Sequence, residues 1–393
     1  MPVVVFLASG QVFSTNARSS GGSFSRWAHS RGAATTATNP KHSRYLSTDF
    51  TDKASRYPCH PCNPWSKDFS MPKPLVAILC PKEFRFTDHA ATIETPIVAD
   101  AADVKTLWLD YHSPFPAEVF DATAIILWHG PLVDAGIIAR LKNCRAIIRN
   151  GVGFDTVDTT AAAQAGIPVC NVPDYGTEEV ADHAIALSLA LYRQLFPLDA
   201  EAKRLGWKIA TQHKMRRLST QTFGLVGLGR IGTATALRAK ALGFRVVFYD
   251  PYVPSGVQKA VGVARVNTLD ELLRVADLVS IHCPSTTETR GMIGEKEIAR
   301  MKPGSFLVNT ARGDIVKKAP VFAALRAGHL AGAGLDVVEA EPLRTAEEAA
   351  TPNLICTCHA AFCSPEGMVE MRSTSARIAR AAVLGEAVWN RVN

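Results

Sequence analysis

From residue 75 onward, short apolar segments alternate with longer segments in which apolar residues recur at helical spacing. The short segments are almost wholly apolar, as strands are when both faces of a parallel sheet are covered. Their alternation with helices predicts an α/β fold of doubly wound parallel sheets with crossover helices. The predicted strands are Leu75–Cys80, Ala122–His129, Cys144–Arg149, Val169–Val172, Phe223–Gly227, Arg245–Tyr249, Leu278–Cys283, Ser305–Asn309, Gly334–Val338 and Leu354–Thr357.

The strands fall into two units, one from about Met71 to Asn171 and one from about Phe223 to Cys358. A helix predicted from Thr177 to about Leu195 is apolar on more than one face, so we expect it to cross between the units or to pack in a dimer. A C-terminal helix, from Met368 to about Trp389, can return to the first unit. Other predicted helices are Pro131–Leu141, Ile231–Leu242, Ile293–Met301 and one that begins at a capping box, Thr268–Glu271.

Residues 1–70 differ from the rest of the chain, because they are rich in Ser, Thr, Gly and Arg and show no sustained period. The first 48 residues contain no acid. This composition resembles an organellar transit peptide, and the alternative is that translation begins at Met71, directly before the first strand. We therefore expect a disordered or transit-like leader, and a cytoplasmic protein unless a genuine transit peptide directs it to the mitochondrial matrix.

The formal net charge of +7 does not predict nucleic-acid binding, because its distribution is uneven. Eight Lys/Arg and three Asp/Glu precede Met71, which leaves 35 basic and 33 acidic residues, or +2, on the remaining chain. No apolar run approaches the roughly 20 residues that a membrane span needs. We expect neither a direct nucleic-acid partner nor a membrane partner.

The nine cysteines are scattered, and most lie in predicted strands, which indicates buried thiols in a reducing compartment. Cys59-His60-Pro61-Cys62 has the spacing of half a zinc site. No second Cys/His pair with metal spacing follows it, so no metal is expected.

The segment Gly227-Leu228-Gly229-Arg230-Ile231-Gly232 has the spacing of a dinucleotide-binding turn. It follows a predicted strand, opens a predicted helix, and precedes a second strand that ends before Asp250. Gly227 would allow the tight turn, Gly229 the approach of a pyrophosphate, and Gly232 close packing of the helix on the strand. Asp250 can accept hydrogen bonds from ribose hydroxyls and would repel a 2′-phosphate, so the predicted cofactor is NAD rather than NADP.

Arg312, Glu341 and His359 each follow a predicted strand, at the carboxyl ends where open α/β sheets bind ligands. An arginine can hold a carboxylate through two hydrogen bonds, and a histidine can exchange a proton near neutral pH. A glutamate can hydrogen-bond the imidazole and orient it. Together these residues predict hydride transfer between NAD and C2 of a small 2-hydroxy or 2-keto acid.

Several motifs, in order along essentially all of residues 75–393, resemble those of the D-isomer-specific 2-hydroxyacid dehydrogenases. Within this family, Cys170-Asn171, Glu178-Glu179, "NLICT" and "HAAF" resemble the C-terminal-binding-protein group. The motifs are "NGVGFDTVD" (150–158), "VCNVPDYGTEEVADHA" (169–184), "GLGRIG" (227–232), "NTARG" (309–313), "GLDVVEAEP" (334–342) and "HAAF" (359–362).

The resemblance implies a catalytic set and a cofactor site. Arg312, Glu341 and His359 match the catalytic arginine, glutamate and histidine of the family, and Asp336 matches an acid near the nicotinamide carboxamide. The cofactor wall is implied at Cys283–Thr289, which includes Pro284, and at Thr310 and Ala311. The substrate site is implied at Val152 and Gly153, whose backbone N–H groups would hold the carboxylate, and at His129 and Arg312.

The resemblance also implies the architecture. A Rossmann NAD-binding domain, residues 173–361, would be inserted into a flavodoxin-like substrate domain made of residues 71–172 and 362–393. The protein would form a homodimer through its nucleotide domains.

The chain departs from the family at three places. Lys317-Lys318 stand where an Asp often follows, which puts a local helix cap in doubt. Cys358 replaces the proline that usually precedes the histidine, so we expect His359 to be held less rigidly. Phe362 stands where the corepressors carry Trp, which alters the pocket.

Two functions from different classes follow. The first is an NAD-dependent D-2-hydroxyacid dehydrogenase or 2-keto acid reductase, whose substrate the sequence does not choose among glyoxylate, hydroxypyruvate and 3-phosphoglycerate. The second is an NAD(H)-sensing transcriptional corepressor or scaffold of the C-terminal-binding-protein type. The transit-like leader and the lack of a long tail after Asn393 count against the second.

Overall fold

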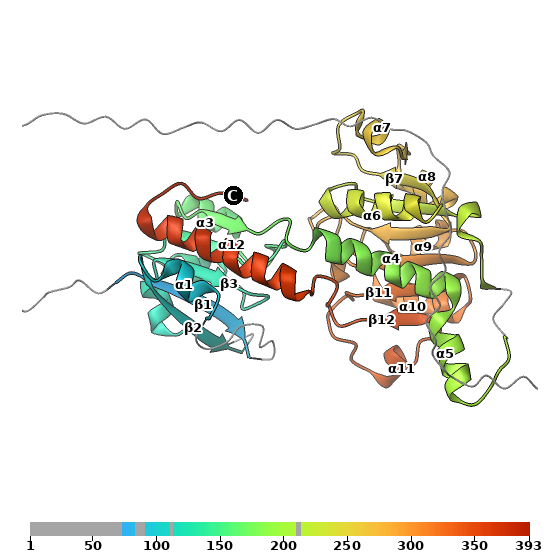
Figure 1. Ribbon diagram of the computed structural model, residues 1–393, viewed down its shortest axis with the longest axis horizontal. Helices are drawn as coiled ribbons and strands as arrows, with labels where there is room; N and C mark the ends of the chain where they lie inside the picture. Colours follow the sequence, from blue (N-terminus) through green and yellow to red (C-terminus); the bar gives the residue numbers. More distant parts are fainter. Residues whose placement is uncertain (1–72, 83–90, 111–112, 210–213) are drawn as a thin grey trace, which may run out of the picture. The chain divides into compact units, whose positions relative to one another are not determined.

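A computed structural model describes residues 73–82, 91–110, 113–209 and 214–393. These residues form two parallel β-sheets with helices on their faces (Figure 1). The predicted α/β fold of doubly wound parallel sheets is therefore confirmed. The leader over residues 1–70, the Cys59–Cys62 motif and the alternative start at Met71 lie outside the described residues.

The first sheet has five parallel strands in the order β2-β1-β3-β4-β5, which is the order of flavodoxin-like folds. Its strands are β1 (Leu75–Pro81), β2 (Asp103–Leu109), β3 (Ala124–Leu127), β4 (Ala146–Arg149) and β5 (Val169–Asn171). The helices within this part of the chain are α1 (Glu94–Val98), the 3-10 helix η1 (Ala117–Asp121), α2 (Ala135–Ile138) and α3 (Thr159–Gln164).

The second sheet has seven parallel strands in the order β12-β11-β10-β9-β6-β7-β8. The order reverses beside β6, the first of these strands in the chain, as it does in a Rossmann fold. The strands are β6 (Thr222–Val226), β7 (Arg245–Tyr249), β8 (Ala264–Arg265), β9 (Leu278–Ile281), β10 (Ser305–Asn309), β11 (Leu330–Leu335) and β12 (Leu354–Cys356). The helices are α6 (Arg230–Ala241), α7 (Val257–Val261), α8 (Leu269–Val275), α9 (Glu295–Arg300), α10 (Lys318–Arg326) and α11 (Ala346–Ala349), with 3-10 helices η3 (Leu218–Thr220) and η4 (Gly313–Ile315).

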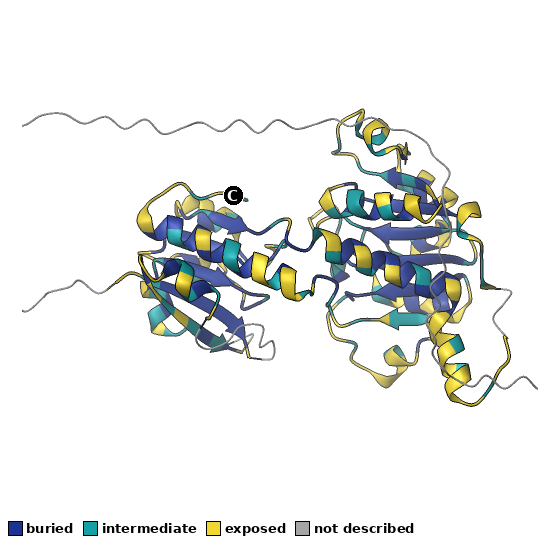
Figure 2. Ribbon diagram, viewed as in Figure 1, coloured by how far each residue is buried: buried dark blue, intermediate teal, exposed yellow. Residues whose placement is uncertain are grey.

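Both sheets are the cores of their parts of the molecule, because their central strands are buried on both faces (Figure 2). Every residue of β3, β4, β6, β9 and β10 is buried. This burial explains why those strands are wholly apolar or nearly so, and why the pattern of the sequence located them.

Helix α4 (Thr177–Arg193) joins the two cores. Val180, near its start, packs in a core cluster of the first sheet, whereas Leu187 and Leu191 pack in a cluster of the second sheet. Gln194 then adopts a left-handed conformation (φ 53°), and α5 (Leu195–Lys203) begins after it. The prediction that this helix crosses between the two units is confirmed.

Helix α12 (Pro365–Leu384) returns to the first sheet, where Met371, Ile378 and Val383 join its core cluster. It begins before the predicted Met368, because the Ser364 side chain accepts a hydrogen bond from the Gly367 N–H at 2.8 Å. It also ends before the predicted Trp389, because Gly385 takes the left-handed conformation (φ 74°) that closes a helix.

A buried ion pair ties α12 to α1. Arg372 donates through Nε and Nη2 to the two carboxylate oxygens of Glu94, each at 2.7 Å, and the Glu94 side chain has no exposed surface. Removing either partner would leave a buried charge uncompensated, which typically costs about 3–5 kcal/mol.

Two strands were not predicted, and both lie at sheet edges. Strand β2 alternates exposed and partly buried residues over its first half, so it lacks the apolar run by which the others were recognised. Strand β8 has only two residues. An edge strand has one neighbour and more contact with water, and its sequence is correspondingly less apolar.

One predicted strand is shifted. The strand predicted at Gly334–Val338 is β11, Leu330–Leu335, and it carries two internal glycines. A Cβ on Gly334 would lie 3.0 Å from the Leu187 Cβ of α4, and one on Gly332 would lie 2.8 Å from a Leu191 methyl. The two glycines interrupt the apolar pattern by which the other strands were recognised, and they also let α4 pack closely against this strand.

Helix ends differ from prediction for local reasons. The helices predicted at Pro131–Leu141 and Ile293–Met301 are shorter, and Asp134 caps the first of them by accepting from the Ile137 N–H at 2.9 Å. The capping box at Thr268–Glu271 is half formed. Thr268 Oγ1 accepts from the Glu271 N–H at 3.1 Å, but Glu271 Oε2 accepts from the Asn267 N–H instead of that of Thr268.

The cap of α10 that Lys317-Lys318 put in doubt is supplied from a neighbouring loop. Glu339 Oε2 accepts from the Lys318 N–H at 3.1 Å, and Glu339 Oε1 pairs with Lys317 Nζ at 2.7 Å. A carboxylate at the start of a helix is the favourable charge for that position.

Candidate active site

The glycine-rich turn between β6 and α6 has the geometry that the sequence predicted. Gly227 has φ 97°, and a Cβ there would lie 2.7 Å from the carbonyl oxygen of His282. A Cβ on Gly232 would lie 2.3 Å from the carbonyl oxygen of Gly227, so this glycine lets α6 pack against the turn. A Cβ on Gly229 would meet nothing within 4 Å, which leaves open space at the start of the helix. These are the separate requirements of a turn that receives a pyrophosphate.

Asp250 follows β7 and lies beside this turn. Its Oδ2 accepts from the Leu228 N–H at 2.8 Å, and its Oδ1 accepts from the N–H groups of Tyr252 at 2.9 Å and Val253 at 3.2 Å. Backbone groups therefore fix the carboxylate before any ligand arrives. Asp250 is the acid that the sequence predicts to bind the adenosine ribose.

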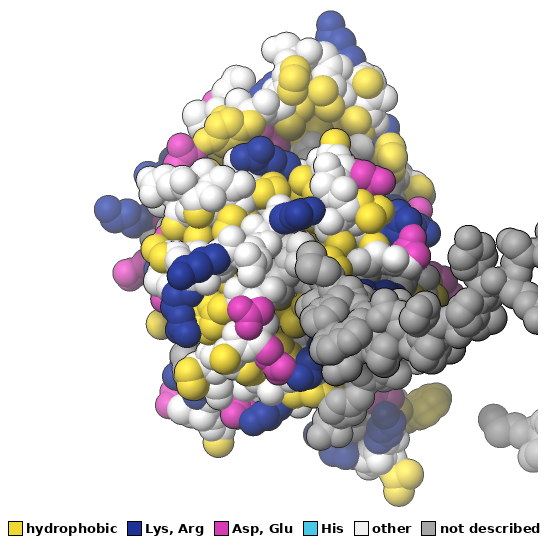
Figure 3. All heavy atoms as spheres, turned by 90° about the vertical axis from the view of Figure 1, so that its left-hand side faces the viewer, with side chains coloured by type: hydrophobic (Ala, Val, Ile, Leu, Met, Phe, Trp, Pro, Cys, Tyr) yellow, Lys and Arg dark blue, Asp and Glu magenta, His cyan; other side chains and the backbone are white. Residues whose placement is uncertain are grey.

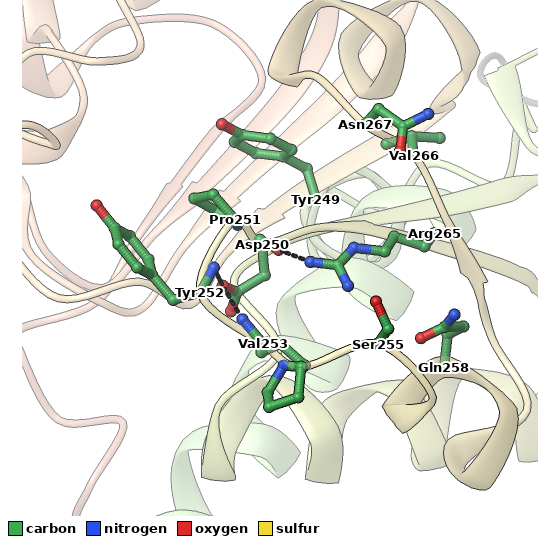
Figure 4. A pocket seen from close by; sticks show the side chains of 11 residues that line it. Tyr249, Asp250, Pro251, Tyr252, Val253, Ser255, Gln258, Arg265, Val266 and Asn267 are labelled. Atoms are coloured by element: carbon green, nitrogen blue, oxygen red, sulfur yellow. Dashed lines mark hydrogen bonds between the residues drawn. The ribbon is translucent and has the colours of Figure 1, made fainter.

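A pocket of about 800 Å³ adjoins Asp250 (Figure 4). Arg265 extends from β8 into it and donates through Nη2 to the carbonyl oxygen of Asp250 at 2.5 Å. We call it the adenosine pocket, because the sequence predicts that the adenosine ribose binds at Asp250. It is lined by Tyr249, Asp250, Pro251, Tyr252, Val253, Pro254, Ser255, Gln258, Arg265, Val266 and Asn267.

A second cavity, of about 370 Å³, lies where carboxyl ends of strands from both sheets meet. His129 and Arg149 reach it from the first sheet, and Thr310, Asp336, His359, Ala361 and Phe362 reach it from the second. Val152, Gly153 and the first residues of α6, Arg230 and Ile231, also line it. This arrangement follows the rule that open α/β sheets bind ligands at the carboxyl ends of their strands. We call it the substrate cavity.

Five residues of the predicted cofactor wall line this cavity: Cys283, Pro284, Thr310, Ala311 and Asp336. Their contact with the cofactor stays a prediction. Thr289 is not among the lining residues, and its hydroxyl instead donates to the carbonyl oxygen of Pro284 at 2.6 Å. Thr289 therefore shapes the loop after β9 rather than the cavity surface.

The residues fit a dinucleotide at two points. Gly229 leaves space where a side chain would stand, and the buried Thr310 hydroxyl has no hydrogen-bond partner among the residues that the structure describes. A buried polar group of this kind is ordinarily satisfied, so a ligand that reached Thr310 would supply the missing partner.

Asp336 organises the loop that carries His359. Its Oδ1 accepts from Thr357 Oγ1 at 2.6 Å and from the Ala360 N–H at 2.9 Å, and its Oδ2 accepts from the Ala361 N–H at 3.0 Å. The Asp336 carbonyl oxygen accepts from the His359 N–H at 2.9 Å. These bonds hold His359 in a left-handed conformation (φ 52°) that few non-glycine residues adopt.

His359 and Glu341 form the predicted pair. His359 Nδ1 lies 3.1 Å from Glu341 Oε2, and both side chains are partly exposed. A carboxylate accepts hydrogen bonds only, so Nδ1 carries the proton of the neutral ring and Nε2 keeps its lone pair. The imidazole is thus prepared to take a proton through Nε2.

Arg312 lies beside the loop that contains Gly153. It donates through Nε to Asp155 Oδ1 at 3.3 Å and through Nη1 to the carbonyl oxygen of Ala311 at 2.8 Å. A Cβ on Gly153 would lie only 1.5 Å from Arg312 Nη2, so the guanidinium occupies the space that a side chain would fill. A side chain at residue 153 would therefore force the Arg312 guanidinium to move.

His129 packs edge-to-face against His359, with ring centroids 5.1 Å apart, and stacks on Phe362 at 5.4 Å. Burial, with the nearby charges of Arg149, His359 and Arg312, holds the pKa of His129 well below its usual range. His129 is therefore neutral at pH 7 and can act as a hydrogen-bonding wall of the cavity rather than as a cation.

Arg149 is a buried cation of this cavity that the sequence analysis missed, and Asp155 beside it was missed as well. Arg149 ends β4, is buried at 3% exposure, and donates through Nη1 to the carbonyl oxygen of Asn150 at 2.5 Å. Burial acts to raise the pKa of Asp155, but the positive charges of Arg312 and Arg149 outweigh it and lower that pKa. The rule that singled out Arg312, a charged residue at the carboxyl end of an apolar strand, would also have found Arg149.

Two wider observations bear on partners and metals. In the part of the chain that the structure describes, no cluster of three His, Cys, Asp or Glu side chains could hold a metal ion, and no helix is long and apolar enough to cross a membrane. On the face shown in Figure 3, Lys and Arg side chains are interspersed with acidic and apolar ones.

Residues 185–361 match a sequence family described as "D-isomer specific 2-hydroxyacid dehydrogenase, NAD binding domain". Over 326 residues the chain is 31% identical to C-terminal-binding protein 1 of Caenorhabditis elegans, covering 80% of this chain and 44% of that protein. Over 302 residues it is 34% identical to D-3-phosphoglycerate dehydrogenase of Mycobacterium leprae (strain TN), covering 76% of this chain and 57% of that protein. The chain thus spans about half the length of these two relatives.

The fold is also similar to a crystal structure of D-lactate dehydrogenase from Aquifex aeolicus in complex with NAD and lactic acid. The TM-score is 0.71 at 29% identity, and the match covers 79% of this chain and 96% of that one. Together with the NAD-binding family match, this similarity confirms NAD as the predicted cofactor.

Proposed function

Because the chain belongs to the D-isomer-specific 2-hydroxyacid dehydrogenase family, we propose that it transfers a hydride between NAD and C2 of a small D-2-hydroxy or 2-keto acid. One observation carries the proposal. His359 and Arg312 follow separate strands and both line the substrate cavity, and Glu341 lies within hydrogen-bond distance of His359 Nδ1. When bound, NAD would supply the hydride acceptor, and the proton and the substrate contacts would come from residues of this chain.

Arg312 is the residue that we assign to the substrate carboxylate and to the C2 oxygen. Its guanidinium is placed by two hydrogen bonds, to Asp155 and to the Ala311 carbonyl oxygen. A guanidinium fixed in this way can hold a carboxylate without first losing the freedom of a mobile side chain. The backbone N–H groups of Val152 and Gly153, beside it, would complete the carboxylate site.

His359 is the residue that we assign to the proton. In the oxidation direction, Nε2 accepts the C2 hydroxyl proton as the hydride leaves C2. Glu341 then stabilises the imidazolium through Nδ1–H, 3.1 Å away. In the reduction direction, the imidazolium returns this proton to the oxygen of the keto group.

The charge of the cavity favours an anionic substrate. Three arginines, Arg149, Arg230 and Arg312, line it, against two carboxylates, those of Asp155 and Asp336. The volume of about 370 Å³ and the rings of His129, Phe362 and Tyr175 favour a small acid over a bulky one. We assign Arg149 to a second contact with the anionic substrate.

The test is NADH oxidation at 340 nm by the full chain against glyoxylate, pyruvate, hydroxypyruvate and its phosphate ester. We expect turnover of at least one acid, loss of that turnover in Arg312→Ala, and a KM for the acid raised about 10-fold or more in Arg149→Gln. Turnover that survives in Arg312→Ala would contradict the assignment of the carboxylate site.

A second candidate, an NAD(H)-sensing corepressor or scaffold, is favoured by the 31% identity to C-terminal-binding protein 1. The same assay separates the two. Tight NADH binding without turnover of any acid would favour the sensing role, because a sensor needs the cofactor site but not the proton relay.

We also propose that residues 71–172 with 362–393 form the substrate domain, that residues 173–361 form the NAD-binding domain, and that the full chain acts in the cytoplasm, or in the mitochondrial matrix if residues 1–70 are a transit peptide. The sharpest check on the boundaries is limited proteolysis, which should cut near 172 and 362 before it cuts inside either sheet.

A homodimer is favoured by the surface after α4. Helix α5 contains no buried residue, and large apolar side chains that follow α4 are exposed: Leu195, Phe196, Leu205, Trp207 and Ile209. A second copy that covered this surface would remove it from water. Light scattering should give twice the 42.3 kDa of the chain, and a monomer would overturn this proposal.

A further inference from the structure

The adenosine pocket contains a cation, Arg265, to which the proposed dehydrogenase reaction assigns no role. We propose that Arg265, with the hydroxyl of Ser255, forms a phosphate subsite beside the adenosine ribose. This subsite would bind the 2′-phosphate of NADP(H). The preference of the protein for NAD(H) would then come from the Asp250 carboxylate alone. The inference rests on the nucleotide site of the proposed function and not on its turnover.

The guanidinium of Arg265 is held in the pocket from two sides. It lies 5.6 Å from the centroid of the Phe248 ring, and its Nη2 donates to the carbonyl oxygen of Asp250. Figure 4 shows the side chain reaching from β8 toward Asp250, with Ser255 and Gln258 below its guanidinium in this view. One N–H is therefore used by the backbone, and the guanidinium has further donors for a ligand of the pocket.

The charge of Arg265 is not neutralised locally. Among the described residues, no carboxylate forms an ion pair with it, whereas Arg274 and Arg300 both pair with Asp270. The Asp250 carboxylate accepts from three backbone N–H groups and not from Arg265. A half-buried guanidinium beside a polar cavity of about 800 Å³ is a site that a phosphate group can neutralise.

Asp250 and Arg265 therefore act in opposite senses on the same ligand group. A 2′-phosphate carries about 1.5 to 2 negative charges, which the Asp250 carboxylate repels and the Arg265 guanidinium attracts. A charge-assisted hydrogen bond corresponds to about 10- to 100-fold in affinity. The pocket would then favour NAD(H) over NADP(H) by a smaller factor in affinity than the Asp250 carboxylate alone would give.

The test is calorimetric binding of 2′,5′-ADP and 5′-AMP to the full-length protein, which needs no turnover. The two probes differ in the 2′-phosphate. In Asp250→Ser we expect affinity for 2′,5′-ADP to rise about 10-fold, and in Asp250→Ser/Arg265→Gln we expect that gain to be lost. Affinity for 5′-AMP should differ less than about 3-fold between these two variants.

The matched control is Asp250→Ser/Lys259→Gln, which removes an exposed cation on α7 that does not line the pocket. It should keep the gain in affinity for 2′,5′-ADP. The proposal is overturned if Arg265→Gln weakens both probes equally, because Arg265 would then only position the Asp250 loop. It is also overturned if Asp250→Ser gains no affinity for 2′,5′-ADP.

If the wild type bound neither probe, the nucleotide pocket itself would be wrong and the subsite with it. The keto-acid assay reports separately on the activity, so the two failures remain distinguishable.

Discussion

The adenosine pocket and the substrate cavity are built in opposite ways. Every residue that lines the adenosine pocket lies between Tyr249 and Asn267, and three backbone N–H groups hold its key carboxylate. The substrate cavity is lined by residues from His129 to Phe362, and the contact that places Arg312 joins residues 157 positions apart. The lining of the first site comes from one short segment, with one further hydrogen bond from Leu228 of the glycine turn, whereas the second site exists only when both sheets are in place.

This difference indicates which changes each site can absorb. The adenosine pocket depends on backbone hydrogen bonds, which persist when a neighbouring side chain changes. The substrate cavity depends on side-chain contacts between sheets, where a displacement of about 1 Å can cost about 100-fold in rate. We therefore expect variants in the cavity to lose turnover while nucleotide binding is retained.

The variant His359→Ala should show the largest difference between its effect on turnover and its effect on nucleotide binding. Removal of the group that exchanges the proton should lower kcat by about 10²- to 10⁴-fold. Affinity for 5′-AMP, measured by calorimetry, should remain unchanged because no residue of the adenosine pocket is altered. Near-wild-type kcat would show that another residue moves the proton.

A smaller and more discriminating effect is expected from two matched glycine variants. In Gly153→Ala the added methyl would lie 1.5 Å from Arg312 Nη2, so the guanidinium must move, and kcat/KM for the keto acid should fall about 100-fold. In Gly229→Ala the methyl meets no protein atom within 4 Å, so the fold is undisturbed, but it occupies the space left for the pyrophosphate. We expect Gly229→Ala to weaken NADH binding about 10-fold or more.

The two variants serve as controls for each other. Gly153→Ala should bind NADH as the wild type does, and Gly229→Ala should keep its thermal stability because the local backbone (φ −74°) suits alanine. If both variants lost NADH binding to the same extent, the division into a local and an inter-sheet site would be wrong.

Sequence reasoning located the glycine turn and the strand ends, because their signals lie in short stretches of the chain. The glycine turn, Asp250 and the three strand-end residues Arg312, Glu341 and His359 were predicted from strand ends and spacing alone. The structure brings Glu341 and His359 within hydrogen-bond distance and places Arg312 on the same cavity. Parallel strands present their carboxyl ends at one edge, so this convergence follows from topology.

It failed where the cause lay elsewhere in the chain. The glycines of β11 allow the close packing of α4, which the sequence of β11 does not indicate. The cap of α10 comes from Glu339, which the sequence at the start of α10 does not indicate. The left-handed backbone of His359 depends on Asp336, a residue that the family resemblance assigned only to the cofactor. Whether Cys358 loosens His359 stays a prediction, because the bonds that hold the loop come from Asp336.

The buried pair of Glu94 and Arg372 has a consequence for the order of assembly during synthesis. Strands β1 to β5 leave the ribosome first, yet their core is completed by Met371, Ile378 and Val383 of α12, which emerges after every strand. Until then Glu94 has no guanidinium to neutralise it. The seven-stranded sheet, whose strands all lie between Thr222 and Cys356, can close earlier. The first sheet therefore cannot complete its core until α12 has been synthesised, and chaperones would bind it while one of its faces is still uncovered.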